Sequence, residues 1–473
     1  MYDYRMLIDG ARVVGEDGLF DVINPATEVA FAQCTSCSLD QLDQAVNAAQ
    51  AAFKGWQHST HEYRRDCLRR IADDIEQDAE NLAKVIVAEQ GKPLALAFSE
   101  VMGGVAWTRY AADLDIPVEL VEDTPTHRIE LHRKPLGVVA SITPWNWPFM
   151  IAIWHIMPAL HAGNCVISKP SSLTPFSTLC LVEIIARHVP RGVINIVTGE
   201  RGLGGAISSH SGIHKIVFTG STATGQRVMQ AAAGNLKRLT LELGGNDAAI
   251  VLPGTPVDSV VEDIFQAAFL NMGQTCAALK RLYVHESQYQ AFADALVEIA
   301  ACQVVGDGLE PDVNFGPVQN RDQLELVAEL VDDARAQGGQ VLCGGARLER
   351  PGFFYPPTIV TGISDGQRLV DEEQFGPVLP LIAYRDVEDA LRRANASDMG
   401  LGGSVWGADL EQAQALASRL ESGVAWVNCH AQIQPNTPFG GSKMSGFGVE
   451  FGLEGLLECT GQQLLFVRKR ETV

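Results

Sequence analysis

The sequence predicts an α/β protein with two doubly wound, mainly parallel β-sheets. Three observations support this prediction: the length of 473 residues, an early series of short apolar runs separated by helical stretches, and a second series of the same kind. At about 100–200 residues per domain, the length favours two or three domains. Strands buried on both faces appear as continuous apolar runs, and the helices between them cover the sheet.

The first part of the chain is predicted to be helical. Apolar residues recur there at intervals of three and four positions, which is the spacing of one helix face. Gly91-Lys92-Pro93 separates the last two helices, because proline suits the first turn of a helix. The predicted helices cover residues 38–53, 62–89 and 92–113.

Apolar runs that end at turn residues then alternate with helices, which predicts a parallel sheet. We expect strands at 136–142, 165–168, 215–218 and 248–252, and helices at 149–160, 175–188 and 224–233. The second series predicts strands at 281–284 and 341–343, and helices at 286–300, 322–337, 388–394 and 410–419. The break between the two sheets is expected near Gly244-Gly245.

Two segments fit neither series. Residues 126–134 alternate between apolar and polar side chains, which predicts an exposed β-hairpin, and residues 462–467 predict a lone strand. Unpaired strand edges attract further strands. Self-association is therefore one hypothesis for these segments.

The composition is that of an ordinary globular protein, and it disfavours several classes of function. Hydrophobic residues make up 46% of the chain, and 57 acidic against 36 basic residues give a net charge of −21. This charge disfavours binding to nucleic acids and to anionic membranes. No apolar run reaches the roughly 18 residues of a membrane span. The N-terminus shows no secretory leader, so we expect a cytoplasmic protein.

The ten cysteines predict neither a disulfide framework nor a metal site. They are too sparse for the former and lack the paired spacing of zinc ligands. Cys34 and Cys37 form a single C-x-x-C, which we interpret as accidental. Cys165 and Cys302 lie in apolar runs, and we expect both to be structural.

Three reactive groups in separate motifs could together trap and hydrolyse a carbonyl compound. Asn146 lies in TPWNWPF (143–149), Glu242 in LELGG (241–245) and Cys276 in NMGQTCA (271–277). A thiolate attacks carbon, an amide N–H stabilises the oxyanion, and a carboxylate takes a proton from thiol or water. Because a lone cysteine is more often inert packing, this interpretation depends on all three motifs.

These motifs resemble those of the NAD(P)-dependent aldehyde dehydrogenase superfamily. The resemblance extends over nearly the whole chain, from LIDG (7–10) and INPAT (23–27) to PFGGSKMSG (438–446), with the motifs in the family order. It implies an aldehyde-dehydrogenase-like fold: a variant Rossmann cofactor domain (residues 1–117 and 136–244) and a catalytic domain (residues 245–444). Residues 118–135 and 445–473 would form a small β oligomerisation arm and tail of a homodimer or homotetramer.

The resemblance implies NAD or NADP as the cofactor, bound at an unusual turn. The strand at 215–218 continues into TGSTATG (219–225), whose Ser and Thr suit a helix N-terminus that favours a diphosphate. Ser221 is expected near the diphosphate, between Gly220 and Gly225. The spacing also suggests a P-loop, but Gln226 stands where that motif needs lysine. The cluster GLGG (202–205) is explained as a turn.

Lys169 and Ser172 are expected beside the adenosine ribose. A lysine at the end of a parallel strand reaches the ligand crevice. NAD-preferring relatives usually carry Glu at the position of Ser172, where a carboxylate would repel a 2′-phosphate. We therefore expect NADP to be accepted alongside NAD. The resemblance also assigns to the cofactor Trp145, Leu243, Glu373 and Phe375, of which Glu373 would bind the nicotinamide ribose.

The resemblance implies a cycle in which Cys276 attacks the aldehyde and Asn146 binds the oxyanion. Glu242 then activates water to hydrolyse the thioester. Glu450 matches a position proposed in relatives to relay protons from Glu242. Its usual lysine partner is replaced here by His155, which can move protons, although a histidine in an apolar helix is more often a core residue.

The substrate pocket implied by the resemblance is apolar. It comprises Trp147, Ile151, Trp154, Thr275, Ala277, Ile433 and Phe439. Trp154 replaces an arginine of succinate-semialdehyde enzymes, and Ile433 replaces an aromatic residue of betaine-aldehyde enzymes. We therefore expect a medium aliphatic or aromatic aldehyde. A betaine-aldehyde-type or semialdehyde dehydrogenase and a non-catalytic structural homologue remain alternatives.

Overall fold

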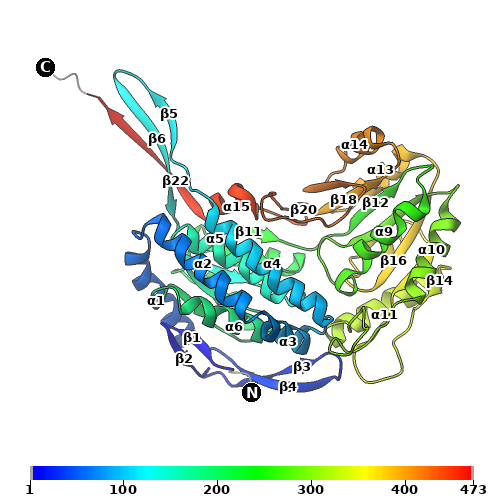
Figure 1. Cartoon of the computed structure of the whole chain (residues 1–473), viewed down its shortest axis with the longest axis horizontal. Helices are drawn as coiled ribbons and strands as arrows, with labels where there is room; N and C mark the ends of the chain where they lie inside the picture. The colour runs from blue at the N-terminus through cyan, green and yellow to red at the C-terminus, as the bar shows by residue number, and fades with distance from the viewer. Residues whose placement is uncertain (1–3, 470–473) are drawn as a thin grey trace.

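Two large sheets lie side by side in the structure, a computed structural model that describes residues 4–469. A narrow three-stranded arm projects from the body of the molecule (Figure 1). The predicted α/β architecture with two mainly parallel sheets is confirmed. Within residues 4–469, no helix combines the length and the apolar character needed to traverse a lipid bilayer.

The first sheet has eight strands in the order β2, β1, β9, β8, β7, β10, β11, β21. Its five central strands are parallel, and β1, β2 and β21 are antiparallel to their neighbours. Strands β7, β8 and β10 are buried at every residue, which explains their mainly apolar sequences. The bounds are β1 (Met6–Ile8), β2 (Ala11–Val13), β7 (Val138–Ile142), β8 (Cys165–Lys169), β9 (Ile194–Ile196), β10 (Lys215–Thr219), β11 (Arg238–Glu242) and β21 (Gly446–Phe447).

The helices of this half form two groups. Helices α2 to α6 pack against one another, and α7 packs against both α1 and α8. Both α1 and α5 contact the central strand β8. The bounds are α1 (Leu39–Trp56), α2 (His61–Gln77), α3 (Ala79–Gln90), α4 (Leu94–Asp113), α5 (Pro148–His161), α6 (Phe176–Ala186), α7 (Arg201–Ser209) and α8 (Thr222–Ala232).

Two predictions for this half were wrong. The single helix expected at 62–89 is divided at Asp78, which leaves the helical conformation (φ −102°, ψ 12°) and accepts a hydrogen bond from Asn81. The glycine cluster at 202–205 lies inside α7 and not in a turn. Glycine disfavours a helix by only about 1 kcal/mol per residue, which tertiary packing overrides.

The second sheet has seven strands in the order β14, β15, β16, β13, β12, β18, β19, of which only β14 is antiparallel to its neighbour. The strand bounds are β12 (Asp247–Val251), β13 (Leu279–His285), β14 (Gln340–Cys343), β15 (Thr358–Thr361), β16 (Val378–Tyr384), β18 (Gly402–Trp406) and β19 (Val424–Val427). The helix bounds are α9 (Val261–Phe269), α10 (Tyr289–Ala301), α11 (Arg321–Ala336), α12 (Arg368–Asp371), α13 (Val387–Asn395) and α14 (Leu410–Ala417), whereas α15 (Gly452–Glu458) packs against α5 of the first half. Two strand pairs, β3 (Leu19–Asn24) with β4 (Val29–Thr35) and β17 (Met399–Gly400) with β20 (Ser442–Lys443), complete the fold.

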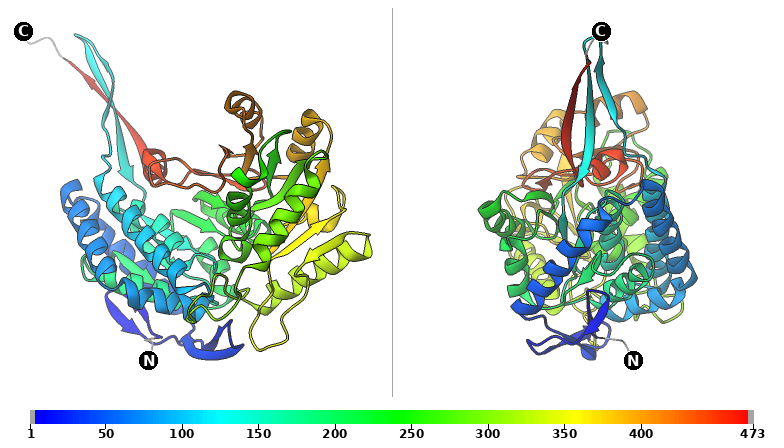
Figure 2. Two further views of the ribbon diagram at one scale, coloured as in Figure 1. Left: turned by 45° about the vertical axis from the view of Figure 1, so that its right-hand side comes forward. Right: turned by 90° about the vertical axis from the view of Figure 1, so that its left-hand side faces the viewer.

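The arm is an antiparallel sheet of β5 (Glu119–Asp123), β6 (His127–Pro135) and β22 (Thr460–Arg468), in the order β22, β6, β5. It extends well beyond the helices of the body (Figure 2). The hairpin expected at 126–134 is instead one strand, whose partner β5 precedes it. The tail strand is not alone, because β22 pairs with β6 along its length.

Candidate functional site

The candidate site lies at the carboxyl edge of the first sheet, where the chain crosses to the second. Lys169 ends β8 and Glu242 ends β11, while Asn146 and Gly220 follow β7 and β10. Parallel strands bring such residues to one edge, which is where α/β sheets bind ligands. The second sheet begins at Asp247, close to the predicted break.

The Cys276 loop has an unusual backbone. Asn271, Met272 and Gly273 all have positive φ angles, of 52°, 59° and 68°. A side chain on Gly273 would collide with the Gly376 carbonyl, so this position requires glycine. The turn leads from 3₁₀ helix η3 (Leu270–Gly273) to the partly exposed Cys276.

Asn146 is tied directly to this loop. Its Nδ2 donates to the Gln274 carbonyl oxygen at 2.9 Å, and its own carbonyl oxygen accepts from Asn271 Nδ2 at 2.9 Å. In addition, Trp147 Nε1 donates to Thr275 Oγ1 at 3.0 Å. The two motifs that the sequence singled out therefore form one connected unit.

A buried ion pair that the sequence reasoning missed supports Asn146. Lys92 Nζ donates to Glu100 Oε2 at 2.7 Å and to the Asn146 carbonyl at 2.9 Å, and it lies 3.5 Å from the centre of the Trp147 ring. Glu100 Oε1 accepts the backbone N–H groups of Phe149 and Met150 at the start of α5. Burial lowers the pKa of Lys92 to about 8, and Glu100 opposes this shift.

Glu242 is a buried carboxyl group whose two oxygens lack hydrogen-bond partners of regular geometry within the described structure. Burial, and then the charge of Glu450, raise its pKa well above the usual value, while the Gly441 N–H opposes this shift. A raised pKa suits a carboxylate that must accept a proton from water.

Glu450 and His155 lie together, as the proton-relay hypothesis requires. His155 Nε2 is 3.2 Å from Glu450 Oε1 and 2.9 Å from Thr219 Oγ1, and Nδ1 is 3.1 Å from Ser141 Oγ. His155 is buried and hydrogen-bonded to Ser141 and Thr219, as a satisfied core histidine is, and it also faces Glu450. The resemblance named His155 as the residue at the partner position of Glu450, and the structure shows the contact between them, which joins α5 to the C-terminal segment.

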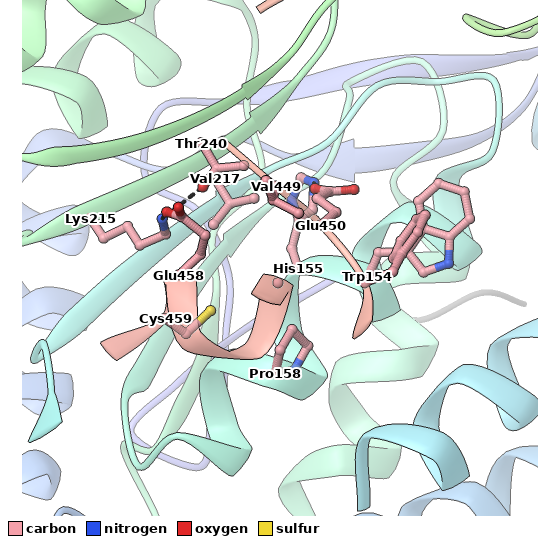
Figure 3. Close-up of a pocket in the computed structure, with 12 residues that line it drawn as sticks. Trp154, His155, Pro158, Lys215, Val217, Thr240, Val449, Glu450, Glu458 and Cys459 are labelled. Atoms are coloured by element: carbon pink, nitrogen blue, oxygen red, sulfur yellow. Dashed lines mark hydrogen bonds and ion pairs between the residues drawn. The ribbon is translucent and has the colours of Figure 1, made fainter. Parts of the chain in front are cut away.

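A small cavity of about 20 Å³ adjoins this pair, with room for roughly one water molecule. Figure 3 shows His155 and Glu450 on one side of it and Lys215 with Glu458 on the other. Lys215 Nζ donates to Thr240 Oγ1 at 2.7 Å and lies 3.5 Å from Glu458 Oε2. The Glu458 side chain is 41% exposed, so this chain of polar groups reaches the surface.

Lys280 is the positively charged residue that most influences the Cys276 thiol, and it was not predicted from the sequence. Burial raises the pKa of the Cys276 thiol to about 12, and the charge of Lys280 is the main opposing influence. Lys280 Nζ donates to the carbonyl oxygens of Thr275 (2.6 Å) and Cys276 (3.0 Å). A lysine four residues after a reactive cysteine was the available signal.

The residues expected at the diphosphate form a suitable helix N-terminus. Ser221 caps α8 by accepting from the Thr224 N–H, and Gly220 lies just before it. Gly225 is buried against Leu243, where an added Cβ would approach the Leu243 side chain to 2.5 Å. The first turn of α8 is exposed, so its backbone N–H groups are available to an anion.

The other cofactor positions fit a ribose and a flat ring. Burial lowers the pKa of Lys169 to about 8, and its Nζ donates only to the Pro170 carbonyl among described residues. Glu373 Oε1 accepts from the Gly245 N–H at 3.0 Å, so its other oxygen can accept a further hydrogen bond.

Phe375 meets Trp145 edge-on, with ring centres 5.4 Å apart. Ser172 is partly exposed in the turn after β8.

Aromatic side chains form a cluster beside Cys276. Trp154 lies 4.7 Å from Phe451 and 5.7 Å from Trp107, measured between ring centres, and Phe439 lies 5.8 Å from Phe451. Trp107 and Phe451 were not predicted, because they come from α4 and the C-terminal segment. The same cluster includes Ala277 and Ile433, whereas Ile151 is buried in α5.

Within residues 4–469, neither the other cysteines nor any group of potential metal-binding side chains forms a second candidate site. All ten cysteines lie in the described part of the chain as free thiols; Cys34, Cys37 and Cys165 are buried. Cys302, which was expected to be structural, is exposed at the end of α10 and is not a buried packing residue. Among residues 4–469 no His, Cys, Asp and Glu side chains gather as a metal site.

The two sheets and the site between them are those of a dinucleotide-dependent oxidoreductase. The chain belongs to the aldehyde dehydrogenase family, whose model matches residues 13–465. It is 38% identical to aldehyde dehydrogenase LUC3 of Fusarium sp over 464 residues, covering 98% of each chain. It is also 38% identical to retinaldehyde dehydrogenase 3 of Homo sapiens, covering 93% of this chain and 88% of that one.

A solved structure agrees with this assignment. Betaine aldehyde dehydrogenase from Staphylococcus aureus in complex with NAD+ superposes with a TM-score of 0.96 at 31% identity, covering 100% of this chain and 96% of that one. The protein is therefore an NAD(P)-dependent aldehyde dehydrogenase. The family, the enzyme class and the cofactor predicted from the sequence are confirmed.

Proposed function

We propose that the protein oxidises a medium aliphatic or aromatic aldehyde to its carboxylic acid through a thioester on Cys276. The main support is the unit formed by Asn146 and the Cys276 loop, with the aromatic cluster on one side and Glu242 nearby. These groups supply the nucleophile, the oxyanion donor and the base that the reaction needs.

In the first half of the reaction, the Cys276 thiol gives its proton to the Glu242 carboxylate, and the sulfur bonds to the aldehyde carbon. The Asn146 amide and the Cys276 N–H bind the oxyanion of the thiohemiacetal. Burial raises the pKa of the thiol, and the positive charge of Lys280 opposes that shift and so favours the thiolate. A bound NAD or NADP would supply the acceptor for the hydride that the thiohemiacetal carbon loses, and a thioester then remains on the sulfur.

In the second half, Glu242 takes a proton from water as the water oxygen attacks the thioester carbon. The carbon–sulfur bond breaks, the acid leaves and the thiolate is restored. We propose that the proton passes from Glu242 to Glu450 and His155, and then through the cavity toward Lys215 and Glu458. The 3.2 Å distance between His155 Nε2 and Glu450 Oε1 supports this route.

The pocket favours a neutral substrate. Lys92 Nζ lies 3.5 Å from the centre of the Trp147 ring, so the chain's own cation already covers one face of that ring. A quaternary ammonium group binds through aromatic faces, and Lys92 would repel it. A betaine-aldehyde-type activity stays the second candidate, since the betaine enzyme has the same fold.

We also propose that NADP is accepted beside NAD, because Ser172 places no carboxylate at the adenosine ribose.

The proposed cofactor domain is residues 1–117 and 136–244, and the catalytic domain is residues 245–444. Self-association through the arm as a homodimer or homotetramer is supported by its exposed apolar side chains Leu120, Val121, Leu464 and Phe466. Free thiols at all ten cysteines suit the cytoplasm.

The test combines substrate turnover with trapping of the intermediate. Reduced cofactor is followed at 340 nm with octanal, benzaldehyde, betaine aldehyde and succinate semialdehyde, each with NAD and NADP. Acid-quenched enzyme is then analysed by intact mass and peptide mapping for an acyl group on Cys276, with Cys276→Ser as the control. Preference for a charged aldehyde would refute the substrate class, and an adduct elsewhere would refute the mechanism.

A further inference from the structure

Lys280 connects the nucleophile loop to a cofactor-binding position. The residue lies in β13 and is almost completely buried, with its side chain only 3% exposed. Two donors of its ammonium group are directed to the carbonyl oxygens of Thr275 and Cys276, at 2.6 and 3.0 Å. The nearest carboxylate, Glu373 Oε1, is 3.6 Å away.

Glu373 forms the outer end of this connection. Its side chain is 20% exposed, and its Oε1 also accepts from the Gly245 N–H at 3.0 Å. Gly245 itself is packed against the Cys276 carbonyl, to which an added Cβ would approach within 2.7 Å. Glu373 therefore reaches the nucleophile loop twice, through the Gly245 backbone and through Lys280.

We propose that Lys280 is a positioning residue that couples Glu373 to Cys276. Its ammonium group donates hydrogen bonds to the two loop carbonyl oxygens, and its positive charge favours the Cys276 thiolate. The negative charge of Glu373 partly offsets that positive charge. The inference deepens the proposed function, since it assumes that Cys276 is the nucleophile. The proposal predicts that a ligand bound at Glu373 changes how readily the Cys276 thiol ionises.

The charges around the thiol give this proposal a definite sign. Among the described residues whose charges act most strongly on Cys276, Lys280 is a cation, and Glu242, Asp247 and Glu373 are anions. Asp247 in turn faces His430, with Oδ2 3.6 Å from Nε2. Neutralising Lys280 should therefore disfavour the thiolate, whereas neutralising Glu373 should favour it.

The test is the rate of Cys276 alkylation by iodoacetamide, with the modified residue identified by peptide mapping. Full-length parent, Lys280→Met, Lys280→Arg and Glu373→Gln proteins are compared from pH 6.5 to 9.5. We expect Lys280→Met to react at least about ten-fold more slowly, which corresponds to one pKa unit. Lys280→Arg should recover part of the rate, and Glu373→Gln should react faster than the parent.

A matched control is Lys237→Met, which removes another buried lysine whose Nζ contacts Asn235 and not the loop. Its alkylation rate should equal that of the parent. In the Lys280→Met background, Glu373→Gln should accelerate alkylation less than it does alone, because the two residues act through one charge.

The outcomes separate this inference from the proposed function. If the parent is alkylated elsewhere and not at Cys276, the nucleophile assignment fails and the coupling fails with it. If the parent reacts at Cys276 but Lys280→Met reacts equally fast, the coupling alone is overturned. Should Lys280→Met not fold, Glu373→Gln decides: a rate equal to or below that of the parent overturns the coupling.

Discussion

His155 Nε2 lies 3.2 Å from Glu450 Oε1, and Glu450 in turn raises the pKa of Glu242 by like charge. Three titratable groups from β11, α5 and the C-terminal segment thus form one electrostatic unit. The small cavity beside them continues the unit toward Glu458 at the surface (Figure 3). This arrangement makes the hydrolysis half of the reaction sensitive to substitutions outside the aldehyde pocket.

Replacing Glu450 should change the pH dependence of turnover. Because the Glu450 charge raises the pKa of Glu242, Glu450→Gln lowers that pKa and moves the acidic limb of the kcat profile to lower pH. The relay predicts a lower maximal kcat as well. Glu458→Gln, at the exposed side of the cavity, is the control and should move the limb less. An unchanged acidic limb in Glu450→Gln would contradict this view.

Removing the oxyanion donor should slow the reaction without disabling the thiol. Asn146→Ala loses the side-chain N–H, so kcat/KM should fall by about 10²–10³. Alkylation of Cys276 needs no oxyanion donor and should change little in the same variant. Steady-state kinetics and alkylation rates measured on one preparation check both statements, and parallel losses would instead indicate a collapsed loop.

Introducing a carboxylate at the adenosine site should separate the two cofactors. Ser172→Glu places a negative charge where the 2′-phosphate of NADP would bind, so kcat/KM for NADP should fall by at least about ten-fold. The value for NAD should stay the same or rise. Ser172→Gln has a similar size without the charge and serves as the control. Equal changes with both cofactors would place Ser172 away from the ribose.

Breaking the buried pair under Asn146 should destabilise the fold. Lys92→Met leaves Glu100 buried without its cation, and the free energy of unfolding should fall by about 3–5 kcal/mol. The double variant Lys92→Met/Glu100→Gln should lose less than the sum of the single changes, since neither charge is then left alone. Denaturant unfolding of the four proteins measures this coupling. Additive losses would show that the pair does not interact.

Stability should fall as pH rises from about 4.5 to about 7 because of Glu89. Burial raises the pKa of this carboxyl from 4.5 to about 7, although the N–H groups of Phe176 and Ser177 oppose the shift. The folded state binds the proton more tightly, so the contribution is complete below about pH 4.5 and is lost through about pH 7. The loss is up to about 3 kcal/mol. Unfolding of Glu89→Gln should show a smaller fall; an identical slope would contradict the assignment.

Much of the fold and of the reactive set follows from local sequence. Apolar runs such as 165–168 predict β8 because a central parallel strand is buried on both faces. The break at Asp78, the glycine-containing α7 and the pairing of β22 with β6 were not predicted. These features depend on contacts between distant segments, which local periodicity does not encode.

The sequence by itself determined the family, the cofactor class and the identity of the residues proposed to react, because the order and spacing of motifs are properties of the sequence alone. Only the tertiary structure decided which groups surround them. It placed Lys280 beside the Cys276 loop, and Lys92 with Glu100 beside Asn146. The physical reason is that desolvation and charge pairing act through space, between atoms that folding brings together.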